Sequence, residues 1–253
     1  MARLRKPLQG VGNIIRFNWH FYVLFAVGVA AIILLKIVLP VIGNYVYVAI
    51  VLASLTVFTS LTVSWYVYDF STLYILNWLD KLLPNQQSHI VNINAGFDEF
   101  SELLQAKYPN AQLTVLDFYD ATKHTEVSIK RARMAHPPYP GTIAIQTESV
   151  PLQHSSVDTI FLLLAAHEIR NEQERSLFFK QLSNVLKPDG RIIVSEHLRD
   201  APNLLAYNIG AFHFHAHSAW LATFSAAGLA VEKEQKITPF ISTFVLRKHG
   251  ASS

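Results

Sequence analysis

The sequence predicts an α/β protein in which a doubly wound, mainly parallel sheet follows a two-helix transmembrane hairpin. From His89 onward, short apolar runs alternate with helix-like segments, a pattern typical of parallel sheets with crossover helices. Before that point, two long apolar runs, 21–41 and 45–67, are separated by only a few residues. Their closeness predicts two helices joined by a tight turn.

Composition limits the classes of function. Hydrophobic residues make up 51% of the 253 residues and charged residues only 15%, which is apolar for a soluble protein. The absence of cysteine excludes disulfides and Cys-based metal or nucleophile sites. No acidic residue precedes Asp69, and the five basic residues before it leave 16 basic residues against 18 acidic ones elsewhere. That balance predicts no nucleic-acid partner.

Each apolar run has the ~20 residues that a helix needs to cross a bilayer. Only Lys36 is charged within them, and its stem can reach the headgroups. The stretch 39–44, LPVIGN, supplies turn residues between the runs. Aromatic residues at the outer ends predict a belt at one membrane face: Trp19, His20, Tyr22, Trp65, Tyr66 and Tyr68. A cleaved signal peptide or a buried helical core is less consistent with two runs of this length.

The positive-inside rule predicts the orientation. Four basic residues precede the first run: Arg3, Arg5, Lys6 and Arg16. We therefore expect a bacterial inner-membrane protein with both termini and the soluble domain in the cytoplasm. The predicted parts are a basic cytosolic tail (1–20), the hairpin (21–68), an interfacial helix and linker (69–88) and the α/β domain (89–253). The apolar positions of 70–83 fit either a helix lying along the membrane surface or one packed on the domain.

Within the domain, periodicity predicts five strands, three helices and a final hairpin. The strands are expected at 89–94, 111–118, 141–146, 157–164 and 190–197. The helices are expected at 97–107, 172–186 and 218–228, the last ended by Gly228. The stretches 229–237 and 242–249 are expected to pair as the hairpin.

Two stretches carry a family resemblance. LKPDGRIIVSEH (186–197) resembles the segment that leads into and forms the fifth strand of class I S-adenosylmethionine-dependent methyltransferases. ESVPLQHSSVDTIFLLLAAHEI (148–169) resembles the same family around its fourth strand, and the resemblance covers about 70–248. It implies a seven-stranded Rossmann-like sheet, S-adenosyl-L-methionine as cofactor and S-adenosyl-L-homocysteine as product.

The resemblance also implies the cofactor site. The turn after the first strand would face the methionine part of the cofactor, and the end of the second strand would bind ribose and adenine. The ends of the third and fourth strands would border the adenine edge and the sulfonium. The residues concerned are Asn92, Asn94, Ala95, Gly96, Phe97, Asp117, Phe118, Gln146, Thr147 and Leu163.

The turn departs from the family pattern because Gly96 is its only glycine. Asn92 stands where the family usually has an acid, and Asn94 and Asp98 stand where it usually has glycine. Asn94 tolerates a left-handed backbone. Asp98 can cap the following helix and receive the cofactor's amino group. We interpret the turn as an altered, working cofactor site.

Four candidate catalytic residues follow the fourth and fifth strands: His167, Glu168, Glu196 and His197. A histidine near its unperturbed pKa of about 6.5 is a natural general base for a phenol or an enol, with His167 the first candidate and His197 the second. The alternative is that these histidines cap helices, contact headgroups or pack.

The insert 207–220 is expected to line an apolar acceptor pocket with Tyr207, Phe212, His213, His215 and His217. Alternate histidines point to one side only on a strand, and this stretch does not look extended. We therefore expect pocket or headgroup contacts and no metal.

Together these observations predict a membrane-anchored methyltransferase acting on a hydrophobic, membrane-resident acceptor. A phenolic or quinone-type lipid, methylated on oxygen or carbon, is the first candidate and a phospholipid amine the second. The loss of glycines leaves open a non-catalytic lipid-binding scaffold with a degenerate cofactor site. A metal-dependent hydrolase built on the three histidines is a weaker alternative. Nothing in the sequence indicates the oligomeric state.

Overall fold

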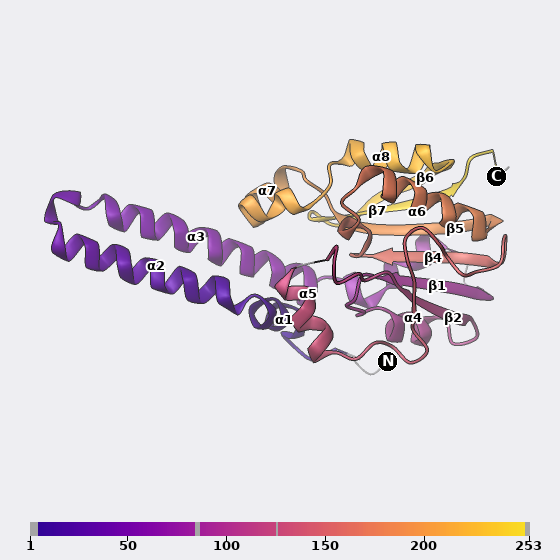
Figure 1. Cartoon of the computed structure of the whole chain (residues 1–253), viewed down its shortest axis with the longest axis horizontal. Coiled ribbons are helices and arrows are strands. Elements are labelled where there is room, and N and C mark those ends of the chain that lie inside the picture. The colour runs from indigo at the N-terminus through magenta and orange to yellow at the C-terminus, as the bar shows by residue number, and fades with distance from the viewer. Residues whose placement is uncertain (1–4, 84–86, 125, 251–253) are drawn as a thin grey trace.

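In the computed structural model, which describes residues 5–83, 87–124 and 126–250, two long helices project from one end of a layered α/β domain (Figure 1). These are α2 (Trp19–Val38) and α3 (Tyr45–Trp65), joined by the turn Pro40–Ile42. We call 19–65 the apolar hairpin. By length and composition alone, both helices are candidate membrane spans, and the domain buries 0% of the first candidate and 6% of the second.

The domain is built on a seven-stranded sheet with the order β3-β2-β1-β4-β5-β7-β6. Strands β1 to β5 are parallel, and β7 runs antiparallel between β5 and β6. Their bounds are β1 His89–Asn94, β2 Gln112–Asp117, β3 Ile143–Ala144, β4 Val157–Leu163, β5 Leu186–His197, β6 Leu229–Thr238 and β7 Ile241–Lys248. The predicted doubly wound, mainly parallel sheet and the terminal hairpin are confirmed.

Both faces of the sheet are covered. Helices α6 (Glu172–Val185) and α8 (His217–Ala226) pack on one face, where Val91 and Ile93 of β1 point. Helix α4 (Ser101–Lys107) and residues 66–83 cover the other face, where Ile90 points. This alternation gives the central strands β1 and β4 two buried sides, which is why they read as continuous apolar runs.

The segment 66–83 forms tight turns on the domain, and the prediction of a helix there is wrong. It comprises a π-helical turn, Tyr66–Phe70, and 3₁₀ turns at Leu73–Ile75 and Asn77–Lys81. Leu73, Leu76 and Leu79 are fully buried against the sheet. Their spacing of three matches a 3₁₀ period. Of the two arrangements left open by the sequence, this region packs on the domain.

The predicted N-terminal tail contains a docked helix, α1 (Gln9–Phe17). The Asp69 carboxylate accepts hydrogen bonds from the backbone N–H groups of Gly10 and Val11, both at 2.8 Å. An acid at a helix N-terminus satisfies free N–H groups and favours the helix dipole. Arg5 pairs with Glu99 at 2.6 Å, while Arg3 lies outside the described residues.

Several elements differ from the sequence prediction. β3 contains two residues where six were expected, and α4 begins four residues later than expected. Besides α1, two further helices were not predicted: α5 (Val127–Ala135) and α7 (Ala201–Tyr207). The 3₁₀ turns Ala166–Glu168 and Asn208–His213 follow β4 and α7. Short helices of this kind depend on tertiary packing more than on propensity.

Gly10 and Gly12 allow a matched test of how α1 docks. A Cβ at Gly10 would lie 2.4 Å from Tyr68 Cβ, whereas one at Gly12 would meet nothing within 4 Å. We expect Gly10→Ala to lower stability by about 1–3 kcal/mol through overpacking. We expect Gly12→Ala to be neutral or to stabilise by up to ~1 kcal/mol through helix propensity. Thermal unfolding in detergent and protease cleavage near α1 measure both effects, and equal behaviour of the two variants would contradict the docking.

Candidate functional site

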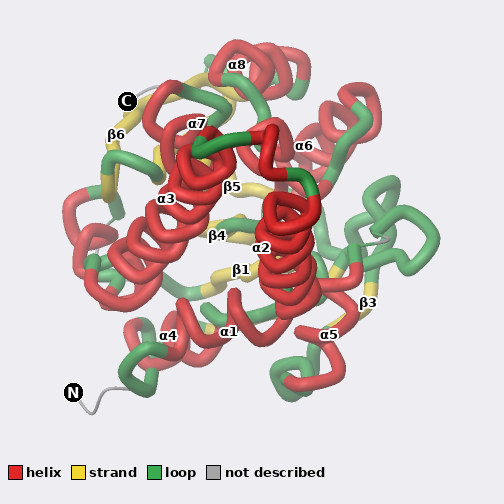
Figure 2. Tube along the Cα trace, turned by 90° about the vertical axis from the view of Figure 1, so that its left-hand side faces the viewer, coloured by secondary structure: helices red, strands yellow, loops and turns green. Residues whose placement is uncertain are grey.

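The carboxyl ends of the parallel strands face the base of the apolar hairpin (Figure 1). Viewed along the hairpin, β1, β4 and β5 lie directly behind α2 and α3 (Figure 2). In sheets of this type, ligands bind beyond the carboxyl ends of the strands. All four predicted catalytic residues and most of the predicted cofactor residues lie at this edge.

The turn after β1 is held by side-chain hydrogen bonds. Asn94 Oδ1 accepts from the Gly96 N–H at 3.0 Å, and Gly96 adopts a φ of +95°. Asn94 itself ends the strand, so the expected left-handed conformation occurs at Gly96 and not at Asn94. Asn92 donates to Ser101 Oγ at 2.9 Å and to Asp98 Oδ1 at 3.2 Å, which ties β1 to the start of α4.

Asp98 has one satisfied and one free oxygen. Its Oδ1 accepts the N–H groups of Phe100 and Ser101, both at 3.0 Å, which confirms the predicted capping role. Its Oδ2 is buried and has no hydrogen-bond partner among the described residues. A buried carboxylate oxygen without a donor is costly, and a cationic amino group at this position would satisfy it.

Asp117 at the end of β2 is engaged by a residue that the sequence did not suggest. Its Oδ1 accepts from the Tyr119 N–H at 2.9 Å, and its Oδ2 pairs with Arg133 at 2.5 Å. Arg133 comes from the unpredicted helix α5, and a Cβ at Gly96 would lie 2.8 Å from its Nη1. The guanidinium therefore lies between the Gly96 turn and the Asp117 carboxylate. The Arg133 side chain is 36% exposed.

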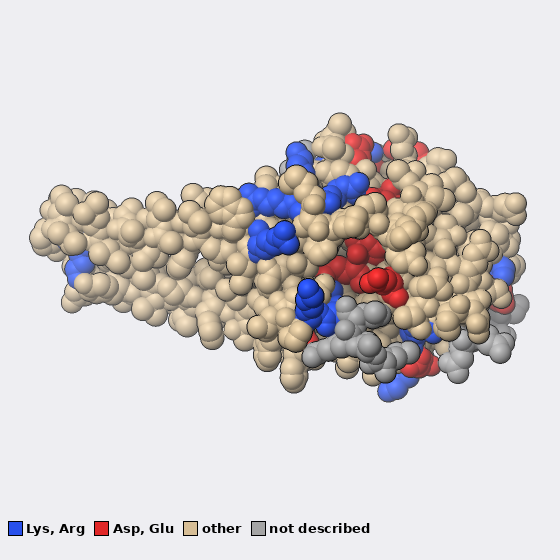
Figure 3. Space-filling view, turned by 90° about the horizontal axis from the view of Figure 1, so that it is seen from below, with Lys and Arg blue, Asp and Glu red and all other residues tan. Residues whose placement is uncertain are grey.

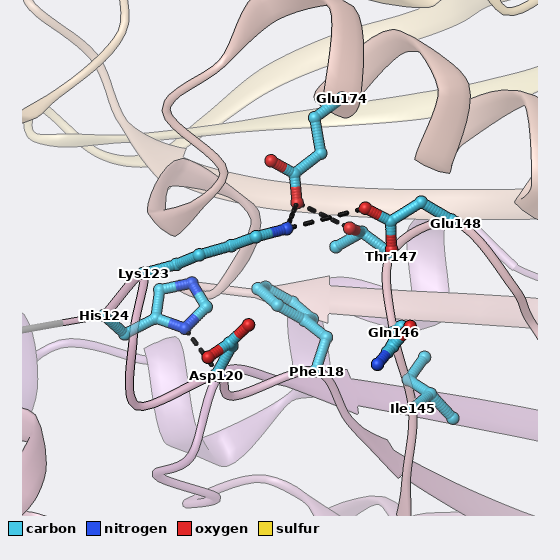
Figure 4. Close-up of a pocket in the computed structure, with 9 residues that line it drawn as sticks. All are labelled: Phe118, Asp120, Lys123, His124, Ile145, Gln146, Thr147, Glu148 and Glu174. Carbon is cyan, nitrogen blue, oxygen red and sulfur yellow. Dashed lines mark hydrogen bonds and ion pairs between the residues drawn. The ribbon is translucent and has the colours of Figure 1, made fainter.

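Beside Asp117 lies a cavity of about 250 Å³ (Figure 4). Predicted residues Phe118, Gln146 and Thr147 line it together with Ile145. Its polar rim contains Glu174, which accepts from Thr147 Oγ1 at 2.5 Å and pairs with Lys123 at 2.7 Å. An aromatic face with polar groups at the edge suits a planar heterocycle.

Three predicted cofactor residues are directed elsewhere. Phe97 packs edge-on against Phe17 of α1, with ring centroids 5.7 Å apart. Ala95 is buried in the core cluster beneath α6 and α8, and Leu163 is buried in the opposite cluster. Ala95 and Leu163 therefore contribute to the core and Phe97 contacts α1, and the predicted contacts of these three side chains with the cofactor stay predictions.

His167 and Glu196 form a buried pair between the ends of β4 and β5. Glu196 is fully buried, and its Oε2 accepts from His167 Nδ1 at 2.7 Å. Its Oε1 accepts from the backbone N–H groups of Ala165 and His167 at 3.1 and 3.2 Å. Glu168 Oε1 lies 3.3 Å from the other ring nitrogen, His167 Nε2.

The charge state of His167 changes its predicted role. Burial by itself lowers the pKa of His167, but the carboxylates of Glu196 and Glu168 outweigh burial and raise that pKa from 6.5 to about 10. Burial disfavours ionised Glu168, yet hydrogen bonds from His167 and His213 hold the pKa of that carboxyl far below its usual range. At neutral pH His167 is an imidazolium, so the expectation of a base near its unperturbed pKa is wrong.

His197 is neutral and fully engaged. Burial is the main cause that lowers its pKa to about 4. The Asn203 amide donates to Asp200 and to the Phe240 carbonyl, so its oxygen faces His197 Nδ1, at 2.9 Å. His197 Nδ1 therefore donates, and Nε2 accepts from the Tyr68 hydroxyl at 2.8 Å. Both ring nitrogens are used, which leaves none free for the predicted role as base.

The alternate histidines of the insert diverge. His213 points toward Glu168 and Glu126, His215 toward Arg175 and His217 toward Glu234. The stretch is not a strand, so the three rings share no face. Tyr207 packs edge-on against His197, with ring centroids 5.3 Å apart, whereas the Phe212 side chain is exposed. The five side chains share no common face, and an acceptor pocket lined by Tyr207 and His213 stays a prediction.

Sequence reasoning missed four residues at this edge. Phe214 stacks on His197, with ring centroids 4.8 Å apart, and meets His167 edge-on at 6.3 Å. Tyr68 reaches the edge from the π-helical turn that follows α3. Arg133 lies on α5, and Glu126 directly precedes that helix. Phe214 could have been suspected because it lies between two histidines. The others come from segments whose position only the tertiary structure defines.

The fold is that of class I methyltransferases. Residues 91–194 match the methyltransferase domain family called Methyltransf_11. Among solved structures, the chain is similar to a SAM-dependent methyltransferase from Methanosarcina mazei, with 14% identity and a TM-score of 0.51 over 68% of this chain and 97% of that one. A SAM-dependent methyltransferase from Aquifex aeolicus gives 12% identity and a TM-score of 0.50 over 69% and 91%. These structures support the fold.

Two curated bacterial proteins are similar in sequence. Demethylmenaquinone methyltransferase of Chlamydia muridarum is 28% identical over 144 residues, which are 52% of this chain and 59% of that protein. The ubiquinone/menaquinone biosynthesis C-methyltransferase UbiE of Geotalea daltonii is 29% identical over 120 residues, 46% of this chain and 47% of that protein. The chain thus spans about half the length of the curated relatives it matches.

Residues 91–194 therefore form a class I S-adenosylmethionine-dependent methyltransferase domain. The residues present fit S-adenosylmethionine, the cofactor of that class. The free oxygen of Asp98 suits its amino group and the cavity at Phe118 suits its adenine. Asp117 would bind its ribose hydroxyls once Arg133 turns away.

The raised pKa of His167 predicts how stability varies with pH. The pKa of about 10 in the folded chain exceeds the unperturbed value of about 6.5, so proton binding favours folding in full below pH 6.5. That contribution decreases as the pH rises through 10. We expect the unfolding temperature of the parent to exceed that of His167→Gln most at pH 6 and less at pH 9.5. The exposed His154 supplies the control, and a constant difference across pH would contradict the pairing.

Cofactor binding is tested by calorimetry with S-adenosylmethionine and detergent-solubilised protein. We expect the parent to bind and Asp117→Ala to lose at least about 10-fold in affinity, because it lacks the acceptor for the ribose hydroxyls. Arg133→Ala should bind at least as tightly as the parent, because it removes a competitor for Asp117. The exposed Asp189 provides the control, Asp189→Ala. Absence of binding by the parent would favour a non-catalytic scaffold.

Proposed function

We propose that this protein is an integral-membrane S-adenosylmethionine-dependent methyltransferase that acts on a hydrophobic, membrane-resident acceptor. A quinone-type lipid methylated on carbon is the first candidate acceptor. The names of the two curated relatives, both quinone methyltransferases, support this choice over a phospholipid amine. Methylation on oxygen of a phenolic lipid is the second candidate reaction.

The observation that carries the proposal is the position of the ligand-binding edge at the base of the apolar hairpin (Figures 1 and 2). The hydrogen bond from Tyr68 to His197 connects the end of the second long helix to the end of β5. Arg131 of α5 donates to the Phe17 carbonyl and contacts His20 at the start of α2. A lipid acceptor could therefore enter the site without leaving the bilayer surface.

A membrane location is supported by the surface around the hairpin. Beside α3, the segment α7 and the turn after it expose Leu205 (78%), Ile209 (86%) and Phe212 (64%). Lys and Arg side chains gather around the hairpin base (Figure 3). At the far turn, Lys36 bonds to Asn44. By the positive-inside rule the base, the domain and both termini would be cytoplasmic, at a bacterial inner membrane.

The predicted aromatic belt is only partly consistent with this surface. Trp19 and Trp65 are exposed at the hairpin base, as an interfacial position requires. Tyr68 instead faces the domain and bonds to His197. The belt in this proposal therefore consists of the exposed residues and does not include Tyr68.

The proposed chemistry depends on the charge at His167. S-adenosylmethionine supplies an electrophilic methyl group when bound. The imidazolium of His167, held by Glu196, would donate a hydrogen bond to the acceptor oxygen and stabilise it as an anion. The acceptor hydroxyl would lose its proton to solvent, and the resulting enolate or phenolate oxygen makes the adjacent ring carbon nucleophilic. That carbon would bond to the methyl group as the sulfonium C–S bond breaks to give S-adenosyl-L-homocysteine, and it would then lose its own proton to solvent. Phe214 and Tyr207 would supply the apolar walls that exclude water.

Proteoliposomes containing the purified protein test the proposal. We expect transfer of labelled methyl from S-adenosylmethionine to a demethylated quinol with an isoprenoid tail, and much slower transfer to the same ring without a tail. His167→Gln should lower the rate about 100-fold, because it removes one preorganised donor of charge. The control is His249→Gln, at an exposed position directly after β7, and it should retain the parent rate.

The outcomes distinguish the alternatives. Equal rates with tailed and tailless acceptors would contradict a membrane-resident substrate. Label in phospholipid headgroups would identify the amine acceptor instead. Label on the ring oxygen and not on carbon would replace C-methylation by O-methylation.

A further inference from the structure

His167, Glu168 and His213 converge at the mouth of the site. Each offers one ligand atom, and the three atoms lie within 4.8 Å of one another. Glu168 Oε1 lies 3.3 Å from His167 Nε2 and 3.5 Å from His213 Nε2. Ligands about 2.1 Å from a tetrahedral zinc ion lie about 3.4 Å from each other, so the two spacings match that geometry.

A carboxylate lies behind each of the two histidines. Glu196 accepts from His167 Nδ1 at 2.7 Å and is itself fixed by two backbone N–H groups. Glu126 Oε1 lies 3.0 Å from His213 Nδ1. Metal-binding histidines usually donate their second ring nitrogen to a carboxylate, which fixes the tautomer and leaves the first nitrogen free to bind. The arrangement occurs twice here, on residues from three different elements.

The charge of the cluster also suits a cation. Three carboxylates, Glu126, Glu168 and Glu196, surround the two imidazoles. Among the described residues, Arg170 is the one arginine or lysine in direct contact with His213. A divalent ion at the two imidazoles would balance the negative charge of these carboxylates.

The geometry points to a divalent transition-metal site of the zinc type, bound by His167 Nε2, Glu168 and His213 Nε2, with Glu196 and Glu126 as supporting carboxylates. Two histidines and one glutamate with a fourth position for water or an acceptor oxygen are a known zinc ligand set. Arg170, whose side chain is exposed, lies against the His213 ring and would turn to solvent when the ion binds. The ion would bind the same His167 Nε2 whose proton faces the acceptor oxygen in the proposed function, so the ion and that proton exclude each other. Metal binding itself does not depend on the methyl acceptor.

Calorimetric titration of chelator-treated, detergent-solubilised full-length protein with ZnCl₂ tests the site, with neither S-adenosylmethionine nor acceptor present. We expect one ion per chain, and no measurable binding by His167→Ala, Glu168→Gln or His213→Ala. Glu196→Gln should weaken binding about 10–100-fold, because it removes the support of His167. Co²⁺ should give the intense visible bands of a tetrahedral site in the parent and lose them in His213→Ala.

His217→Ala is the matched control, because His217 belongs to the same run but pairs with Glu234 on β6. It should bind zinc as the parent does, and so should Arg170→Ala. Absence of stoichiometric binding by the parent, equal binding by His213→Ala, or equal loss in His217→Ala would overturn the site. His213 lies in a half-buried turn, so its variant remains informative if the His167 variant does not fold. If the protein transfers methyl groups but binds no zinc, the metal site is overturned and the proposed function stands.

Discussion

Three consecutive residues after α3 attach the apolar hairpin to the catalytic edge of the domain. Val67 is fully buried against the sheet, Tyr68 bonds to His197 of β5, and Asp69 caps α1. Each side chain points in a different direction because the chain makes a π-helical turn here. The turn therefore converts a helix that is apolar on all sides into a fixed support for the site. The orientation of the hairpin, the position of α1 and the engagement of His197 all depend on it.

The pleat of β5 decides which of its last two residues becomes charged. Glu196 and His197 are neighbours, but neighbouring residues of a strand point to opposite faces. Glu196 meets His167 and two backbone N–H groups, so its buried charge is compensated. His197 is buried among Asn203, Tyr68 and the Phe214 ring, and this burial favours the neutral form of the ring. One strand end thus supplies the carboxylate that holds a positive charge and a neutral histidine that fixes the hairpin.

In the turn after β1, side-chain hydrogen bonds hold a backbone shape that the resemblance to the family would assign to several glycines. The side-chain amide oxygen of Asn94 and the Asp98 carboxylate accept hydrogen bonds from backbone N–H groups and shape the turn. Gly96 adopts the positive φ of the turn, and a side chain at this position would collide with Arg133. The Arg133 guanidinium balances the buried Asp117 carboxylate when no ribose is present. Arg133 of α5 therefore lies at the position where the ribose of the cofactor is expected.

The sequence by itself determined the two apolar helices and the doubly wound, mainly parallel sheet. It also determined, to within one residue, where β1, β2, β4 and β5 end, and so the position of Asp117, His167 and Glu196 at one edge of the sheet. These features follow from periodicity and from the rule that parallel strands end together. Tertiary structure alone decided that 66–83 packs on the sheet, that α5 brings Arg133 and Glu126 to the site, and that His213, His215 and His217 diverge. It also decided the protonation of His167 and His197. Charge state, turn direction and the docking of short helices depend on contacts between residues distant in the chain, and local sequence does not specify these contacts.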